Sequence, residues 1–279
     1  MDIKWIYGDS DKYMKLHRKD DVLWLSVRSL DRFSWLQNAF ATRFGGVSTG
    51  HFASKNLSFE HGDNPDCVRE NIRRICGAIG ISSDQLVCTM QTHTTNVRRV
   101  SRRDCGRALD ETPAFPDVDG LITNEPGVAL MIFFADCVPL FFVDPVHRAI
   151  GASHSGWRGT AGKMARVTIE AMNREFGSDP EHMLAAIGPS ICKNCYTVNG
   201  DVAKRFDERF YEEGTGTDQY QLDLQAANRA LMIEAGIPAE SISMPDLCTG
   251  CNPDLLFSHR ASKGKRGTMA AFLSLTNKS

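Results

Sequence analysis

Two strongly apolar runs, at 128–134 and 138–143, are separated only by Ala135, Asp136 and Cys137. Short apolar runs rich in β-branched and aromatic residues are typical of buried strands. A third run, at 149–153, follows a turn at Asp144 and leads directly to His154. The arrangement predicts three consecutive strands, with a cysteine at the first corner and a histidine between the third strand and a helix. Two soft metal ligands would then lie at neighbouring strand ends of one sheet.

The rest of the chain alternates short strands with a few helices. Asn64 and Pro65 suit the N-cap and first position of a helix, and Gly80 suits its end. Short strands with tight turns favour antiparallel or mixed pairing. No linker, repeat or low-complexity block divides residues 1–279. We therefore expect one compact α+β domain of mixed, mostly antiparallel sheets with flanking helices. Further strands are expected at 86–89, 97–100, 120–123, 183–187, 255–260 and 268–275, helices at 157–176, 199–211 and 224–235, and a surface loop at 212–217.

Charge and cysteine content exclude several functional classes. The net charge of −2, from 32 Lys and Arg against 34 Asp and Glu, gives no electrostatic basis for binding nucleic acid or an anionic membrane. No apolar run approaches the roughly 20 residues of a membrane helix, and no signal-peptide core is present. Nine cysteines without an export signal favour free thiols or metal ligands in a reducing compartment. We expect a cytoplasmic protein and, because no heptad seam is apparent, a monomer.

Three potential metal ligands share a position at the end of a strand. His93 lies between the strands expected at 86–89 and 97–100, Cys137 at the corner, and His154 before a helix. Each alone has an ordinary explanation: a surface histidine, an inert buried cysteine and a packing histidine. Together, three protein ligands with one open position are typical of catalytic zinc. Asp136 is costly between apolar strands unless it meets a cation or donors, and it is a candidate for proton transfer or for orienting a ligand histidine.

Several polar residues could bind a substrate anion. Arg43 and Arg158 each accompany glycines in a turn, where free backbone N–H groups can help to bind phosphate. The alternative is a structural arginine that bridges loops. Arg260 repeats this pattern more weakly at a strand end. Asn56 and Ser58 lie in a polar loop before the helix that begins after Asn64. Turn formation explains these two residues almost as well as substrate binding does.

Four further cysteines form two CxxC pairs, Cys192 with Cys195 and Cys248 with Cys251. Two such pairs are the pattern of a four-cysteine structural zinc site. The 52 residues between the pairs exceed a usual zinc knuckle, although folding can bring distant segments together. A redox role is less favoured because neither pair opens a helix in a thioredoxin-like unit. Whether this second metal site exists stays open at the level of sequence.

A set of segments resembles the YfiH-like family, long labelled multicopper polyphenol oxidoreductase or laccase-domain proteins. They occur in the family's order from about residue 38 to 272, and Cys195 and Cys248 are also similar to the family. One departure is Thr94, where many relatives have glycine; we expect it to narrow the pocket and leave the ligand intact. The segments are TRFGGVS at 42–48, NLS at 56–58, GD at 62–63, QTH at 91–93, ADCVP at 135–139, HSGWRGT at 154–160, IGPS at 187–190 and FSHR at 257–260.

The resemblance implies a fold similar to the deamidase domain of cytotoxic necrotising factor and a zinc ion bound by His93, Cys137 and His154. It also implies phosphorolysis of adenosine, inosine and methylthioadenosine to free base and (methylthio)ribose 1-phosphate, with adenosine deamination as a side activity. A peptidoglycan-editing role has been attached to some bacterial relatives. The residues expected to act in catalysis or to contact nucleoside and phosphate are His93, Cys137, His154 and Asp136, with Arg43, Asn56, Ser58, Gln91, Arg158 and Arg260.

Three other functions compete with this one. The first is a Cys-His or zinc hydrolase acting on an amide in peptidoglycan-precursor editing; in the Cys-His form, Cys137 is the nucleophile and His154 the base. The second is a non-catalytic protein with a structural metal. The third is a copper polyphenol oxidase, because two histidines and a cysteine can also hold copper. Laccase chemistry needs further coppers on His-x-His pairs, however, and the chain has eight histidines and no such pair.

Overall fold

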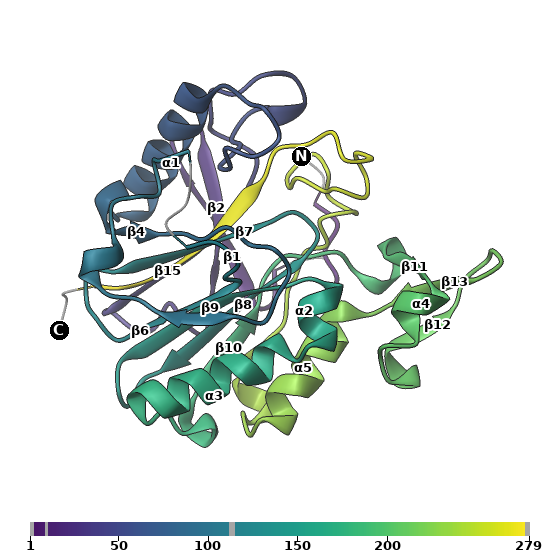
Figure 1. The fold of residues 1–279 in the computed structure, drawn as a ribbon. Coiled ribbons are helices and arrows are strands. Elements are labelled where there is room, and N and C mark those ends of the chain that lie inside the picture. Colours follow the sequence, from purple (N-terminus) through teal and green to yellow (C-terminus); the bar gives the residue numbers. More distant parts are fainter. Residues whose placement is uncertain (1–2, 9–10, 112–114, 277–279) are drawn as a thin grey trace.

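Two six-stranded sheets lie face to face in the computed structural model, which describes residues 3–8, 11–111 and 115–276 (Figure 1). The first sheet contains, in spatial order, β1 (Met14–Lys19), β2 (Val22–Val27), β3 (Leu36–Ala41), β15 (Met269–Leu275), β7 (Ala129–Phe134) and β4 (Leu86–Val87). The second contains β14 (Ile242–Ser243), β10 (Leu184–Ile187), β8 (Val138–Asp144), β9 (Ala149–Ser155), β6 (Gly120–Thr123) and β5 (Val97–Arg99). A separate small sheet contains β11 (Thr197–Asn199), β13 (Gln219–Leu222) and β12 (Tyr211–Glu213).

Helices cover the outer faces of the two large sheets. They are α1 (Pro65–Ile79), α2 (Trp157–Ala161), α3 (Met164–Phe176) and α5 (Leu224–Glu234). The short helix α4 (Gly200–Ala203) lies instead beside β11 and β13 of the small sheet. Helix α1 packs Ile72 and Ile75 on the first sheet, while α3 and α5 pack on the second. Between the sheets, the ring of Phe40 stacks on that of Phe141 with centroids 4.5 Å apart. The result is an α/β/β/α arrangement, which confirms the α+β prediction.

The strand pairing is mixed and mostly antiparallel, as expected from the short connections. The parallel pairs among the described strands are β4 with β7, β5 with β6 and β10 with β14. The central pair of the second sheet, β8 and β9, is antiparallel and joined by a short turn. This hairpin and the crossover from β7 into β8 position the candidate site.

The helix expected after Asn64 is confirmed. The Asn64 side chain accepts a hydrogen bond from the N–H of Asp66, and Gly80 ends the helix with a left-handed φ of 76°. Glycine adopts this conformation without the steric cost that a Cβ atom brings. The capping residues therefore fixed both ends of this element.

Other boundaries differ from the expectation. The helix expected at 157–176 is two helices, because Lys163 has a φ of +63° and interrupts the hydrogen bonding between α2 and α3. The helix expected at 199–211 is wrong: only α4 is α-helical there, and the chain continues into β12. The loop expected at 212–217 therefore belongs partly to the β12–β13 hairpin, in the lobe that projects from the body in Figure 1. The strand expected at 255–260 is a series of turns.

Candidate functional site

Cys137 lies where the chain passes from one large sheet to the other. It follows β7 and directly precedes β8, and the corner requires a left-handed φ of +87° at Asp136. His154 is the penultimate residue of β9 and is paired in register with Pro139 of β8. The antiparallel pairing thus places the cysteine and the histidine at the same edge of the second sheet. This confirms that they lie at neighbouring strand ends.

His93 completes the group from a third segment, the loop before β5. Its Nε2 lies 3.9 Å from the Cys137 sulfur, and its ring centroid is 4.9 Å from that of His154. One potential ligand atom from each of the three residues lies within 4.8 Å of the others. His154 is buried, Cys137 is half-buried and His93 is exposed. The three side chains therefore converge at a site that is closed on one side and open on the other.

The sequence did not single out Asp119, the buried carboxylate that holds both histidines in place. Its Oδ1 accepts hydrogen bonds from the His93 N–H at 3.1 Å and from His154 Nδ1 at 2.8 Å. Its Oδ2 accepts from the N–H of Thr92 and from the N–H and hydroxyl of Thr94. Because Nδ1 of His154 is used here, Nε2 is the nitrogen available to a metal, as is usual for oriented histidine ligands. The feature of the sequence that could have identified Asp119 is its position directly before the apolar run at 120–123.

The charges in the site stabilise a thiolate and an imidazolium. Burial alone raises the pKa of the Cys137 thiol, but the charges and hydrogen bonds of His154 and His93 outweigh it and lower this pKa to about 6. Burial lowers the pKa of His154, but Cys137 and Asp119 raise it to about 9. Burial likewise raises the pKa of Asp119, and hydrogen bonds from His154 and the backbone of the His93 loop hold it below its usual value. Without a metal, the site therefore holds a thiolate at neutral pH.

Gly156 leaves room for the three side chains. A Cβ atom built at this position would lie 2.8 Å from the Cys137 sulfur and 3.2 Å from Cδ2 of His93. A contact under 3 Å requires the neighbouring atoms to move. Any larger residue at 156 would therefore push the thiol and the His93 ring out of position.

Asp136 orients the backbone around the site and does not contact either histidine. Its Oδ1 accepts a hydrogen bond of 2.5 Å from the Thr249 hydroxyl, and its Oδ2 accepts one of 2.7 Å from the Arg260 N–H. The prediction that a carboxylate here needs donors is confirmed. The orientation of a histidine, which the sequence assigned to Asp136 as one option, belongs to Asp119.

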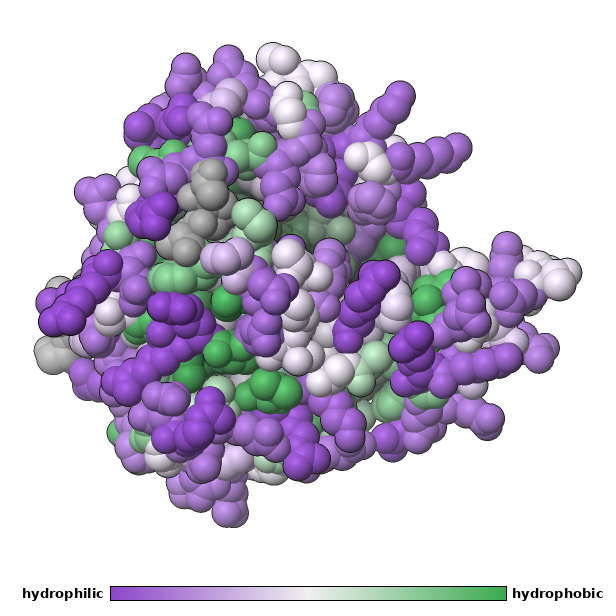
Figure 2. Space-filling view, viewed as in Figure 1, coloured by the Kyte–Doolittle hydropathy of each residue, from purple (hydrophilic) through white to green (hydrophobic). Residues whose placement is uncertain are grey.

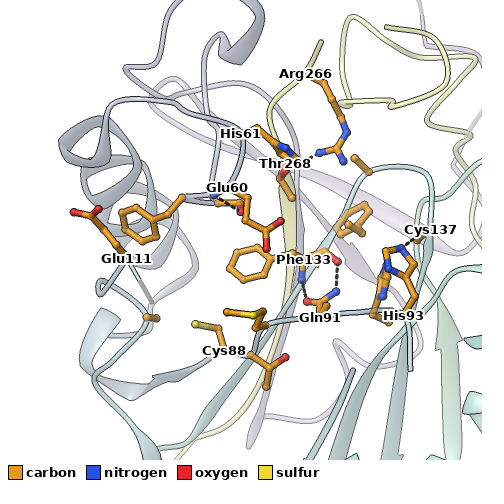
Figure 3. A pocket seen from close by; sticks show the side chains of 18 of the residues that line it. Glu60, His61, Cys88, Gln91, His93, Glu111, Phe133, Cys137, Arg266 and Thr268 are labelled. Carbon is orange, nitrogen blue, oxygen red and sulfur yellow. Dashed lines mark hydrogen bonds between the residues drawn. The ribbon is translucent and has the colours of Figure 1, made fainter. Parts of the chain in front are cut away.

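A pocket of about 850 Å³, counting the solvent at its mouth, opens beside the three residues. His93 and Cys137 lie on one side of it, and Phe59 and Glu111 line it as well (Figure 3). The other lining residues are Ser58, Glu60, His61, Cys88, Thr89, Met90, Gln91, Ala108, Asp110, Phe133, Phe134, Ala135, His154, Arg266 and Thr268.

Two polar atoms in the pocket wall have no hydrogen-bond partner, the Thr89 hydroxyl and Nε of Arg266. Buried polar groups without partners are uncommon in folded proteins. The Arg266 guanidinium points toward the pocket (Figure 3) and donates through one NH group to the Thr268 hydroxyl. Burial lowers the pKa of Arg266, while the charges of Asp136 and Cys137 act in the opposite direction. In the sequence Arg266 lies in a basic turn before β15, and nothing local to that turn indicates a place in the pocket.

The predicted substrate residues divide into two groups. Ser58 and Gln91 line the pocket, and the Gln91 amide is bonded to both the N–H and the carbonyl of Phe133. Arg43, Arg158, Arg260 and Asn56 are not among the described residues that line it. Arg43 donates to the carbonyls of Ala53 and Pro253. Arg158 stacks on Trp157, and Arg260 donates to the Thr197 carbonyl. Asn56 forms hydrogen bonds with Ser58, Asp63 and Thr268.

For Arg43 and Asn56, therefore, the structural explanation left open above is favoured over substrate binding. Thr94 also departs from the expectation that it would narrow the pocket. Its hydroxyl is bonded to Asp119, and it is not among the described residues of the pocket wall.

Comparisons with known proteins agree with the fold and the motifs. The chain matches the family described as "Multi-copper polyphenol oxidoreductase laccase" over residues 37–276. A curated relative, "Purine nucleoside phosphorylase YlmD" of Geobacillus stearothermophilus, is 38% identical over 239 residues, covering 83% of this chain and 87% of that protein. "Adenosine deaminase RL5" of an unknown prokaryotic organism is 33% identical over 230 residues, covering 80% and 87%.

A solved structure extends the likeness to three dimensions. The crystal structure of YlmD from Geobacillus stearothermophilus superposes with a TM-score of 0.88 at 35% identity, covering 94% of this chain and 99% of that one. Among the described residues, no helix combines the length and hydropathy needed to cross a membrane. With matched family residues spanning most of its length, the chain belongs to the YfiH-like, laccase-domain family of enzymes.

Proposed function

We propose that this protein is a zinc-dependent purine nucleoside phosphorylase acting on adenosine, inosine and methylthioadenosine, with adenosine deamination as a side activity. The names of its relatives support purine nucleoside chemistry. The observation that carries the proposal is the convergence of His93, Cys137 and His154 at the wall of a pocket that is open to solvent. Asp119 supports it by fixing the tautomer of His154.

The donor set fits zinc. Two imidazoles and one thiolate are ligands that zinc prefers, and three protein ligands leave one position free. Zinc–ligand distances of about 2.0–2.3 Å place ligand atoms roughly 3.3–3.8 Å apart in a tetrahedron, and the three candidate atoms lie within 4.8 Å of one another. Zinc at such a site lowers the pKa of water and polarises acceptor atoms of the substrate.

The pocket wall offers separate surfaces for base and phosphate. Phe59 and Phe133 provide aromatic surface for the purine. Arg266 lines the pocket and provides a guanidinium charge for phosphate, with His61 beside it. In phosphorolysis a phosphate oxygen bonds to C1′ of the ribose, the glycosidic bond breaks, and its electron pair goes to the purine. The purine nitrogen must then take up a proton. We propose that Glu60, in its protonated carboxylic acid form, donates it, since this side chain enters the pocket (Figure 3).

The primary test measures hypoxanthine released from inosine with and without phosphate. We expect release to require phosphate and to fall at least about 100-fold in Cys137→Ala, because one of three ligands is lost. Cys67→Ala, at a half-buried thiol on α1, is the matched control and should keep wild-type activity. Undiminished release by Cys137→Ala would refute the proposal.

A second pair of variants tests the phosphate site. Arg266→Met should raise the KM for phosphate more than about tenfold, since a charge-assisted hydrogen bond contributes about 1.5–3 kcal/mol. Arg158→Met removes an exposed guanidinium outside the pocket wall and should leave that KM unchanged. A larger rise in the KM for phosphate in Arg158→Met than in Arg266→Met would instead indicate that phosphate binds at the helix after Gly156.

The thiolate–imidazolium character of Cys137 and His154 favours an amide hydrolase as the second candidate. Such an enzyme would keep its activity with a chelator and lose it on alkylation, with a covalent adduct on Cys137. The metal-dependent phosphorylase would lose activity with the chelator. Copper-dependent phenol oxidation has less support, because the described residues contain no histidine-rich cluster besides these ligands.

We also propose that the protein is a cytoplasmic monomer that takes small-molecule substrates. None of the nine cysteines forms a disulfide, which suits a reducing compartment. The face seen in Figure 2 is mostly hydrophilic, with separate small hydrophobic areas. Light scattering after size-exclusion chromatography should give the mass of one chain, and a dimer mass would contradict the monomer.

A further inference from the structure

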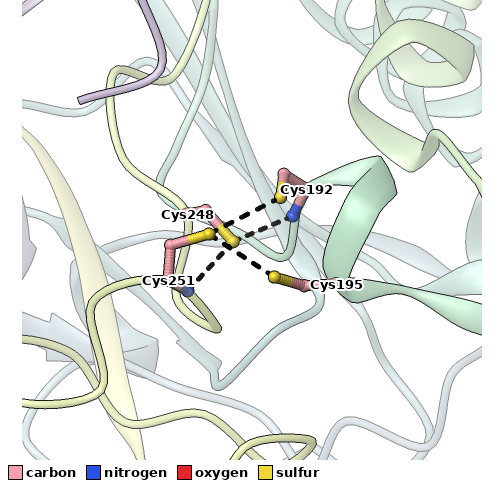
Figure 4. A group of neighbouring side chains, drawn as sticks. All are labelled: Cys192, Cys195, Cys248 and Cys251. Atoms are coloured by element: carbon pink, nitrogen blue, oxygen red, sulfur yellow. Dashed lines mark hydrogen bonds between the residues drawn. The ribbon is translucent and has the colours of Figure 1, made fainter. Parts of the chain in front are cut away.

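The two CxxC pairs, 52 residues apart in sequence, come together in the fold (Figure 4). Strands β10 and β14 are parallel neighbours, so the loops that follow them leave the sheet at the same edge. Ser190 and Cys248 form an isolated parallel bridge between these loops. Cys192 and Cys195 therefore face Cys248 and Cys251, and none of the four lines the pocket that contains His93.

The four sulfurs have the spacing of ligands around one metal ion. All lie within 4.8 Å of one another, with 3.9 Å between Cys192 and Cys251 and 3.4 Å between Cys195 and Cys251. Zinc–sulfur bonds of about 2.3 Å give sulfur–sulfur distances of roughly 3.8 Å in a tetrahedron. A disulfide requires about 2.05 Å and joins sulfurs only in pairs. The observed spacing fits a single shared ion.

The backbone around the cluster favours deprotonated sulfur. The N–H groups of Cys192 and Cys251 both donate to the Cys248 sulfur, at 3.2 and 3.4 Å. Donors directed at one sulfur stabilise the thiolate that a metal requires. Gly250 is also necessary, because a Cβ atom there would lie 3.0 Å from Cβ and 3.3 Å from the sulfur of Cys195.

We propose that Cys192, Cys195, Cys248 and Cys251 bind a second, structural zinc ion in a four-thiolate site. Four protein ligands leave no open position, so this ion holds structure and does not take part in the reaction. The assignment is independent of the proposed nucleoside chemistry, because it uses none of the three residues at the pocket.

The cluster has a role next to the active site. Thr249, within the second CxxC pair, donates its hydroxyl hydrogen bond to Asp136, and the N–H of Ile191, beside the first pair, donates to the Asp136 carbonyl at 3.0 Å. Asp136 is the residue before Cys137. A metal that joins the two loops therefore also fixes the corner that presents the Cys137 thiol.

The test counts metal ions per chain in the purified full-length protein. We expect two zinc ions in wild type and Cys67→Ser, and one in Cys251→Ser and Cys137→Ala. Cys251→Ser should also melt about 5–10 °C lower than Cys67→Ser and turn over inosine more slowly, while Cys137→Ala should lose activity but keep the four-thiolate ion.

A measurement on wild type alone guards against variants that fail to fold. Without a chelator, iodoacetamide should modify Cys67 and leave the four clustered thiols unmodified; after chelation all four should react. Loss of one zinc in Cys137→Ala, with the other kept, supports the second site even if the pocket has no phosphorylase activity. Disulfides among the four cysteines, alkylation of all four in the untreated protein, or iron in place of zinc would overturn the assignment.

Discussion

Replacing Asp119 by asparagine tests how the site is held together. The substitution keeps the size of the side chain and removes its charge and one acceptor oxygen. In the native protein the two carboxylate oxygens accept five hydrogen bonds, from the backbone and hydroxyl of the His93 loop and from His154. All five donors need acceptors, and the NH₂ group of asparagine is not one.

The magnitude follows from the geometry. If the remaining oxygen faces Thr92 and Thr94, the NH₂ group faces the His93 N–H and Nδ1 of His154. His154 must then accept at Nδ1 and carry its proton on Nε2, which removes the lone pair that a metal needs. The His93 N–H also loses its acceptor, at about 1–3 kcal/mol. Loss of a carboxylate behind a histidine ligand lowers metal affinity or activity about 10–100-fold, and we expect Asp119→Asn near the upper end.

Asp117→Asn is the matched control. Asp117 is an exposed residue near the same loop. It accepts hydrogen bonds from the Thr92 hydroxyl and from the Asn96 side chain, and within the described residues its side chain bonds to neither histidine. The assay is competition for zinc against a chromogenic chelator, with inosine phosphorolysis measured on the same samples. If Asp119→Asn kept zinc affinity within about twofold of Asp117→Asn, the argument that Asp119 fixes the ligand tautomer would be refuted.

Three further outcomes follow from the structure. In chelator-treated protein, Cys137 should be alkylated with a half-maximal rate near pH 6, because its folded pKa is about 6. A midpoint near pH 9 for Cys137 would contradict this. Gly156→Ala should weaken zinc binding about tenfold or more. Gly159→Ala should leave zinc binding unchanged, because the atom nearest to the new Cβ lies 3.4 Å away. The same chelator competition measures both variants. Lys55 is fully buried, and burial lowers its pKa to about 7. Between about pH 7 and 10.5 the unfolded chain therefore binds more protons than the native protein. The stability of the native protein rises with pH across that window as a result. Lys55→Met should therefore stabilise by up to about 4 kcal/mol at pH 7 and by less at pH 10 in urea unfolding, and an equal gain at both pH values would count against the buried charge.

Local sequence signals predicted the helices and strands whose ends are marked by capping or turn residues. Asn64 with Pro65 and Gly80 bounded α1 correctly, and the apolar runs around Cys137 defined β7, β8 and β9. The helix expected at 199–211 is limited to α4, because Asn199 and Tyr211 at the two ends of this segment belong to strands that pair with β13. Such nonlocal pairing leaves no periodic signal in the segment itself.

The sequence by itself determined which residues could bind a metal: His93, Cys137 and His154 each lie at a strand end, and the cysteines at 192, 195, 248 and 251 have ligand spacing. Only the tertiary structure decided which of them meet, since that depends on the register of β8 with β9 and on the parallel pairing of β10 with β14. It also assigned the orienting role to Asp119 and brought Arg266 to the pocket. Hydrogen-bond partners and pocket walls are set by contacts between distant segments, and these exist only once the two sheets have packed together.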